Sequence, residues 1–203
     1  MALRQHGFNL IEVMVTLTVL AVLISLGAPG FSEWLQSQRI RASAEAIVNG
    51  MQVARGEAIR RNLSVVLGLQ PPTPGWTVCE ATVTPCDSTT PPTTATVPGV
   101  IQSKSGQEGS GGTNADTTPS GAQIVTTPAG ATLVTFTSLG AVPKTNTDGS
   151  APLTQVDVFY NDPTRCSAAG GTLRCLRVVV TGGGSIRMCD PTPTVVAPDP
   201  RAC

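Results

Sequence analysis

The sequence predicts an α+β protein in which a long N-terminal α-helix packs on an antiparallel β-sheet domain that contains disulfides. Three observations support this fold class: residues 8–31 are almost entirely apolar, residues 32–62 are amphipathic with helical spacing, and short β-type runs separated by turns follow Asn62. The 203 residues leave room for one domain and an anchor, because domains commonly contain about 100 to 200 residues.

The apolar segment at residues 8–31 has the length of a membrane-spanning helix. It contains one charged residue, Glu12, in 24 positions. At about 1.5 Å per residue, such a helix crosses a hydrocarbon core of roughly 30 Å. Arg4 precedes it, so the positive-inside rule predicts a cytoplasmic N-terminus. The alternative is a secretory signal peptide cut near Ala28, but Glu12 near the start of the apolar run and Pro29 directly after the cut disfavour it.

Helical periodicity continues after this segment. Pro29 lacks a backbone donor and clashes with the preceding turn, so we expect a helix break at residues 27–30. Beyond it, six apolar residues recur at spacings of three and four, which places them on one helix face: Ile40, Ala44, Ile47, Met51, Ala54 and Ala58. The helix thus changes from apolar all round to amphipathic, as expected when its second half packs on a domain.

Short apolar or alternating runs in the rest of the chain predict strands at residues 64–69, 75–79, 131–140, 155–160, 173–182 and 185–189. Glycines at 182–184 predict a tight hairpin between the last two. Two stretches poor in apolar residues, 84–96 and 103–121, predict long surface loops, with contact to a neighbouring subunit as the alternative role.

Composition disfavours several functional classes. The formal net charge is 0, so no global charge points to a nucleic-acid partner. His6 is the single histidine, and both lysines, Lys104 and Lys144, lie in runs typical of loops. Because histidine is the commonest general base and a leading zinc ligand, we expect neither an enzyme nor a metal or cofactor site.

The six cysteines predict disulfides. They follow an apolar N-terminal segment and include no CxxC, which favours an oxidising compartment over a zinc or redox site. Six cysteines allow many pairings. Their order along the chain favours three local ones, Cys79 with Cys86, Cys166 with Cys175, and Cys189 with Cys203.

Residues 7–12, GFNLIE, resemble the processing signal of type IV prepilins and pseudopilins: a short basic leader, Gly7, Phe8 and a glutamate at the fifth mature position. The proline near the end of the anchor in that family matches Pro29. The resemblance implies a pilin-like fold, cleavage by a prepilin peptidase between Gly7 and Phe8, N-methylation of Phe8, and pairing of Glu12 with the N-terminal amine of an adjacent subunit. Independently, an ionisable residue in a membrane span points to function.

The second half of the helix resembles the GspH/FimT/FimU family, in which an RxxAxx…A(R/K)xEAIxRN pattern leads into a strand. The matching residues are Arg41, Ala44, Ala54, Arg55, Glu57, Ala58, Ile59, Arg61 and Asn62. Some FimT-type members bind DNA through a C-terminal GRxR motif, but residues 184–187 are GSIR here. Arg174, Arg177 and Arg187 are the candidate DNA contacts, and an excess of three positive charges over residues 165–203 predicts weak binding at most.

The resemblance implies four parts: a leader at 1–7, a transmembrane or filament-core helix at 8–31, an amphipathic helix at 32–62 and a periplasmic β domain at 63–203. We expect a minor pilin of type IV pilus assembly in the bacterial inner membrane. The alternatives are a GspH-type pseudopilin of type II secretion and a DNA-binding minor pilin. Expected partners are other pilins or pseudopilins, the prepilin peptidase and the inner-membrane assembly platform.

Overall fold

The computed structural model describes residues 9–82, 86, 99–106 and 121–203, apart from the side chains of 26–29. The chain divides into two compact units, Met1–Leu35 and Gln36–Cys203, which we describe separately. Within the described residues, no single helix has the length and apolar character to cross a membrane alone. Two helical segments joined by a bend, Leu10–Ser25 and Gly30–Arg61, meet those criteria together, by length and composition.

One helix, α1 (Leu10–Arg61), contains 52 residues and runs through the expected break at 27–30, where the bend lies. Its C-terminal end is capped by Asn62, which has a positive φ of 53°. The Asn62 N–H donates to the Ile59 carbonyl at 3.3 Å and the Leu63 N–H donates to the Ala58 carbonyl at 3.2 Å. This left-handed cap satisfies the last helical carbonyls and directs the chain into the first strand.

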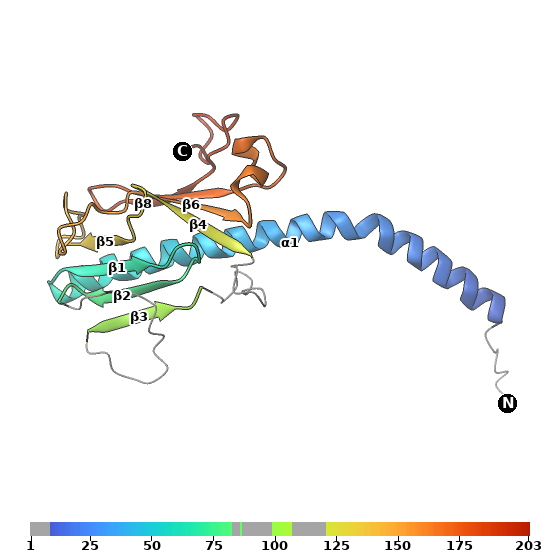
Figure 1. Cartoon of the computed structure of the whole chain (residues 1–203), viewed down its shortest axis with the longest axis horizontal. Coiled ribbons are helices and arrows are strands. Elements are labelled where there is room, and N and C mark those ends of the chain that lie inside the picture. The colour runs from blue at the N-terminus through green and yellow to red at the C-terminus, as the bar shows by residue number, and fades with distance from the viewer. Residues whose placement is uncertain (1–8, 83–85, 87–98, 107–120) are drawn as a thin grey trace, which may run out of the picture. The chain divides into compact units, whose positions relative to one another are not determined.

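The first sheet has the strand order β3-β2-β1-β5, and every neighbouring pair is antiparallel. β1 is central and fully buried, with Leu67 opposite both Val78 of β2 and Val134 of β5. Figure 1 shows β1, β2 and β3 beside the C-terminal half of α1. The strand bounds are β1 (Val65–Leu69), β2 (Trp76–Glu80), β3 (Val100–Lys104) and β5 (Leu133–Phe136).

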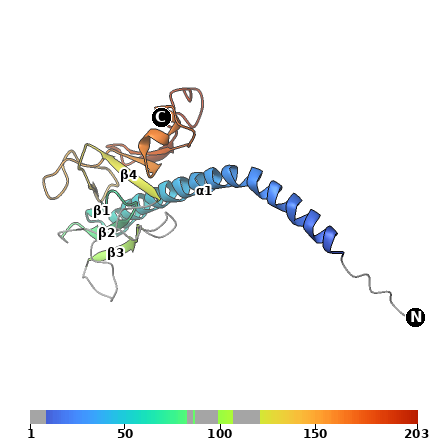
Figure 2. The ribbon, with the colours of Figure 1, turned by 45° about the vertical axis from the view of Figure 1, so that its right-hand side comes forward.

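The second sheet has the order β4-β6-β7-β8 and is also antiparallel throughout. Its strands are β4 (Ala122–Thr127), β6 (Gln155–Tyr160), β7 (Leu176–Val180) and β8 (Ile186–Cys189), of which β4 is marked in Figure 2. Two short 3-10 helices, η1 (Pro163–Arg165) and η2 (Ser167–Ala169), lie in the connection from β6 to β7.

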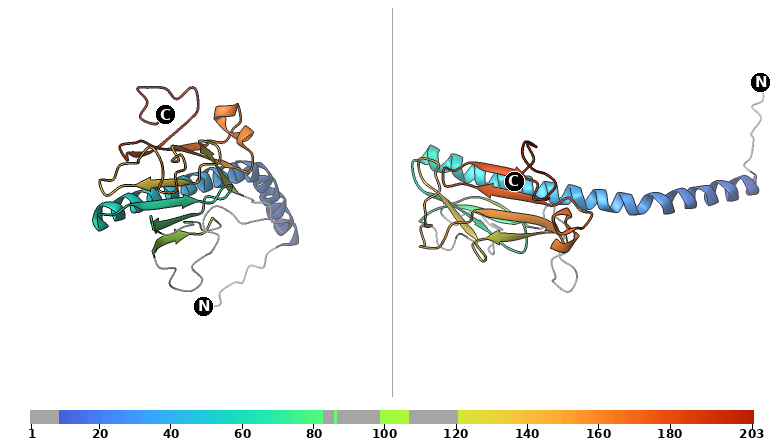
Figure 3. Two further views of the ribbon diagram at one scale, coloured as in Figure 1. Left: turned by 60° about the vertical axis from the view of Figure 1, so that its left-hand side comes forward. Right: turned by 90° about the horizontal axis from the view of Figure 1, so that it is seen from above.

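The core lies where the second half of α1 meets the two sheets. All six residues of the predicted apolar stripe are fully buried, and they form one cluster with side chains from both sheets. Gly50 permits a close approach of the helix to β2, because a Cβ there would lie 2.8 Å from carbons of the Trp76 indole. In the right panel of Figure 3 this part of α1 runs alongside the strands. The predicted packing of an amphipathic helix on antiparallel sheet is confirmed.

Of the eight strands in the described residues, six lie where the sequence predicts them, and β3 and β4 lie outside the predicted strands. Ser103 and Lys104, assigned to a loop, belong to β3. The β3 sequence VIQSK lacks a clear alternation of apolar and polar residues, and β4 directly follows the Gly/Ser-rich run, so neither has the pattern that predicts a strand. The rest of the predicted loops at 84–96 and 103–121 lies outside the described residues, except for the buried Cys86 and residues 105, 106 and 121.

Three disulfides join Cys79 to Cys86, Cys166 to Cys175 and Cys189 to Cys203, which are the pairs that the order of the cysteines favours. The sequence separations are 7, 9 and 14 residues, so each bridge closes a local loop. The first is buried against β1, since Cys79 and Cys86 pack with Val66. The third ties β8 to Cys203.

Candidate functional site

The candidate assembly site lies at the start of α1. Glu12 is in the first helical turn, where its backbone N–H donates to the Asn9 carbonyl at 3.0 Å. Its carboxylate is exposed, and a negative charge is favourable at this end of a helix dipole. Gly7 and Phe8, the expected cleavage and methylation positions, and the leader lie outside the described residues.

The surface around Glu12 is apolar. Arg39 is the first basic residue after it in the sequence, so the segment offers this carboxylate no cation of its own. The large apolar side chains along this part of α1 are exposed: Leu10, Ile11, Val13, Met14, Val15, Leu17, Val19, Leu20, Val22, Leu23 and Ile24. Such a continuous apolar face requires lipid or other helices around it. Pro29, the expected break, is inside α1, in the stretch whose side chains are not described.

The C-terminal hairpin between β7 and β8 is fixed against the helix. Arg55 of α1 donates through Nε to the Gly140 carbonyl at 3.2 Å. Gly184, whose φ is +75°, lies against the same carbonyl, where a Cβ would overlap the oxygen. Of the glycines at 182–184, only Gly184 has the positive φ that was expected of the hairpin. The Gly140 carbonyl thus accepts a hydrogen bond from the helix and lies in close contact with Gly184 of the hairpin.

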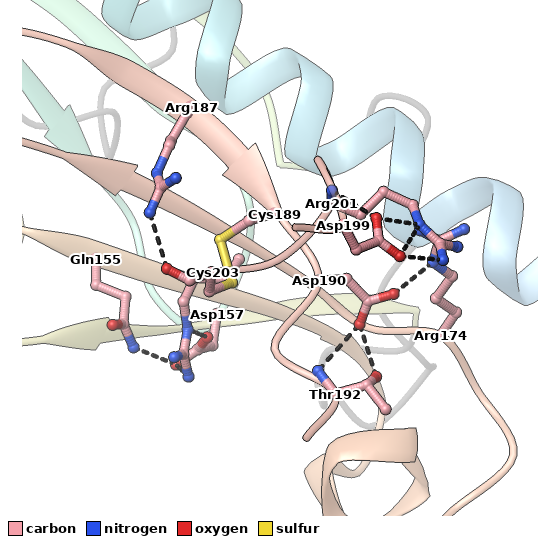
Figure 4. Close-up of a disulfide and its surroundings, with 11 residues drawn as sticks. Gln155, Asp157, Arg174, Arg187, Cys189, Asp190, Thr192, Asp199, Arg201 and Cys203 are labelled. Atoms are coloured by element: carbon pink, nitrogen blue, oxygen red, sulfur yellow. Dashed lines mark hydrogen bonds and ion pairs between the residues drawn. A yellow bond between two sulfur atoms is a disulfide. The ribbon is translucent and has the colours of Figure 1, made fainter. Parts of the chain in front are cut away.

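The three candidate DNA contacts lie on β7, on β8 and just before β7, and two of them are paired with carboxylates, which limits the positive charge that they present. Arg174 pairs with Asp190 at 2.7 Å, and Arg177 pairs with Asp157 at 2.6 Å. Arg187 donates to the Cys203 carbonyl at 2.8 Å, beside the third disulfide (Figure 4). The excess of positive charge over residues 165–203 does not include Asp157, which lies on β6 directly opposite Arg177. The pair depends on the antiparallel register of β6 and β7, which a count of charges along the sequence does not reveal.

Asp190 anchors a network at the end of β8. Its side chain is 4% exposed and accepts hydrogen bonds from the Thr192 N–H at 3.0 Å, the Thr192 hydroxyl at 2.6 Å and Arg174 Nε at 2.7 Å (Figure 4). Burial by itself raises the pKa of this carboxyl, but the bonds from Thr192 and Arg174 outweigh it and hold the pKa below its usual range. The charged form therefore stabilises the fold.

An Asp190→Asn substitution should lower the free energy of unfolding by about 1 to 3 kcal/mol at pH 7, because buried donors lose a charged acceptor. A carboxyl whose pKa is lowered by folding stabilises above its unfolded-state pKa, near 4, and the contribution disappears as pH falls through the lower folded-state pKa. The difference from the unsubstituted protein should therefore shrink between neutral pH and about pH 3. Urea unfolding at both pH values measures it.

Asp199→Asn is the matched control. Asp199 bonds to Arg201, which lowers the pKa of the carboxyl to about 2, but both side chains reach solvent and Arg201 is 55% exposed. Solvent screens such a pair, so we expect a smaller loss than for Asp190. An equal loss for both variants, or one for Asp190→Asn that is unchanged at acid pH, would contradict the assignment.

Among the described residues, no group of three or more His, Cys, Asp and Glu side chains is arranged to hold a metal ion. The described residues show two features that bear on function. One is Glu12 in the apolar part of α1, and the other is a disulfide-bonded domain packed on the second half of α1.

Comparison with known proteins places these features in one class. Residues 3–28 match the family model of the prokaryotic N-terminal methylation motif, and residues 43–184 match the model described as type II transport protein GspH. The motif, the long helix and the domain packed on its second half define a membrane-anchored subunit of the type IV pilin and pseudopilin class. The chain belongs to the GspH family, which confirms the resemblance found in the sequence.

Two crystal structures of the type IV minor pilin FimU of Pseudomonas aeruginosa strain PAO1, in space groups P21 and P65, are similar to this chain. Each is 13% identical, with a TM-score of 0.46, over 73% of this chain. The similar region covers 87% of one FimU chain and 90% of the other. A comparison with curated proteins gives no significant match.

Proposed function

We propose that this protein is a minor pilin that helps to initiate a type IV pilus at the bacterial inner membrane, with its β domain in the periplasm. The observation that supports the proposal most is the methylation motif at 3–28, which runs into an apolar helix with Glu12 as its single charge. Its partners would be other pilins, the prepilin peptidase and the assembly platform. The parts would be a leader at 1–7, an anchor at 8–31, an amphipathic helix at 32–62 and the domain at 63–203.

The chemistry of assembly follows from the position of Glu12. Hydrolysis of the Gly7–Phe8 peptide bond frees an amine on Phe8, and methylation of that amine leaves it basic and cationic. A carboxylate surrounded by hydrocarbon costs on the order of 3 kcal/mol by insertion scales. Pairing Glu12 with the Phe8 amine of a neighbouring subunit offsets much of the cost of leaving either charge unpaired, and it fixes the axial position of one helix against the next.

The second candidate is a GspH-type pseudopilin of type II secretion, which the match of residues 43–184 to the family of type II transport protein GspH supports. Its anchor, cleavage and pairing through Glu12 would be the same, and its filament would differ. Deleting the gene and assaying pili and protein secretion in parallel separates the two: loss of pili with normal secretion supports the pilus, and the reverse supports secretion.

Processing is the direct test of the shared part of this proposal. In a host with a prepilin peptidase, the intact mass of the protein should show loss of residues 1–7 and the addition of one methyl group. A Gly7→Leu chain, which places a branched side chain at the cleavage position, should keep its full length. Loss of residues 1–28 would instead indicate a secretory signal peptide, and an unprocessed chain would contradict the proposal.

A further inference from the structure

Aromatic side chains are distributed unevenly over the protein. The chain has four Phe, two Trp and one Tyr, or 3% of its residues. Trp76, Phe136 and Phe159 are buried in the β domain. Phe31 and Trp34 of α1 are 60% and 55% exposed, and they are the exposed aromatic residues within the described parts of the chain. In this aromatic-poor protein, the two exposed rings of the described residues thus lie within one helical turn.

The two rings form a single unit. Phe31 and Trp34 are three residues apart, which places them on the same helix face. Their ring centroids are 5.8 Å apart and the planes are inclined by 26°, so the rings are stacked. Although the rings stack on each other, each residue remains more than half exposed.

The position of the pair marks a boundary. From Leu10 to Phe31 the helix measures about 32 Å along its path, at 1.5 Å per residue, close to the roughly 30 Å of a hydrocarbon core. The next residues, Ser32 and Glu33, begin the polar part of the helix, and Arg39 is the first basic residue. Tryptophan has an apolar body and a polar N–H, and it concentrates where hydrocarbon meets lipid headgroups.

We propose that Phe31 and Trp34 form an aromatic anchor that lies among the lipid headgroups on the side of the membrane facing the β domain, before the subunit enters a filament. The inference rests on the membrane anchorage in the proposed function and adds the depth at which the helix is held. The neighbouring serine and glutamate suit hydrated headgroups.

The test uses the full chain in vesicles of phosphatidylcholine and phosphatidylglycerol whose acyl chains carry bromine, a contact quencher of tryptophan. The protein has two tryptophans, and Trp76 is 1% exposed in the core. A Trp34→Phe chain keeps a ring at position 34 and reports Trp76 alone. Subtracting its fluorescence from that of the unsubstituted protein isolates Trp34.

Trp34 should be quenched about twofold or more by bromine near the glycerol ester in comparison with bromine near the acyl-chain ends, as expected at the interface. Stronger quenching by the deep bromines would overturn the inference, and so would no quenching with emission shifted to the blue, which indicates burial against protein. In both cases, resistance of the protein to alkaline extraction would show that the membrane anchorage of the proposed function still holds. Release by alkali together with absent quenching would overturn both the inference and the membrane anchorage.

Discussion

A Glu12→Val chain is expected to insert into the membrane, to fold and to be cleaved, yet to be missing from sheared filaments. In the proposed pairing, valine cannot replace Glu12 as the partner of the Phe8 amine of the neighbouring subunit, and that amine would be an unpaired cation among apolar side chains. A cost on the order of 3 kcal/mol corresponds to a loss of incorporation of about a hundredfold. Immunoblots of the sheared and membrane fractions measure the distribution.

Two further variants distinguish charge from bulk. Glu12→Gln keeps the shape of the side chain and removes its charge, so it should fail as Glu12→Val does. Glu33→Gln removes a charge from the same helix beyond the apolar segment and should be incorporated normally. Protease resistance of the β domain should be the same in all of them, since Glu12 lies in a different structural unit. Normal incorporation of Glu12→Gln would rule out charge pairing.

A Gly184→Ala substitution should destabilise the β domain strongly. The φ of +75° at this position is unfavourable for alanine, and the new Cβ would overlap the Gly140 carbonyl oxygen, to which Arg55 also donates. The backbone strain and the displaced turn together should lower the free energy of unfolding by about 3 kcal/mol or more. Chemical denaturation of the protein measures the change.

Gly183→Ala is the adjacent control. Its Cβ would meet nothing closer than the Thr181 hydroxyl at 4.0 Å, and its φ lies outside the positive range. We expect a change within about 0.5 kcal/mol, as for ordinary surface positions. Similar stability of the two variants would show that the hairpin is not held against the Gly140 turn.

The parts of the fold that the sequence predicts are those with a strong local period. The stripe from Ile40 to Ala58 repeats at helical spacing, and all its members are buried. The run at residues 155–160 alternates clearly and has the bounds of β6. By contrast, β4 has an alternating burial pattern, but it directly follows a Gly/Ser-rich stretch, so the start of the strand is difficult to recognise in the sequence.

The candidate site divides in the same way. Glu12 can be identified from the sequence, because a single charge in a long apolar run is visible without any knowledge of the folded structure. The pairing of Arg177 with Asp157 depends on which residues face each other across β6 and β7, and that register follows from packing of the whole sheet. Counting charges along the chain therefore overstated the positive charge near the C-terminus.

In the proposed topology, with the β domain in the periplasm, the spacing of the cysteines bears on the order in which the three disulfides form. The bridges join cysteines 7, 9 and 14 residues apart, so no cysteine pairs with a distant part of the sequence. As the polypeptide emerges N-terminus first behind its anchor, each pair becomes available in turn, from Cys79 and Cys86 to Cys189 and Cys203. Oxidation can therefore follow translocation from one end to the other, without reshuffling of bridges between the two sheets.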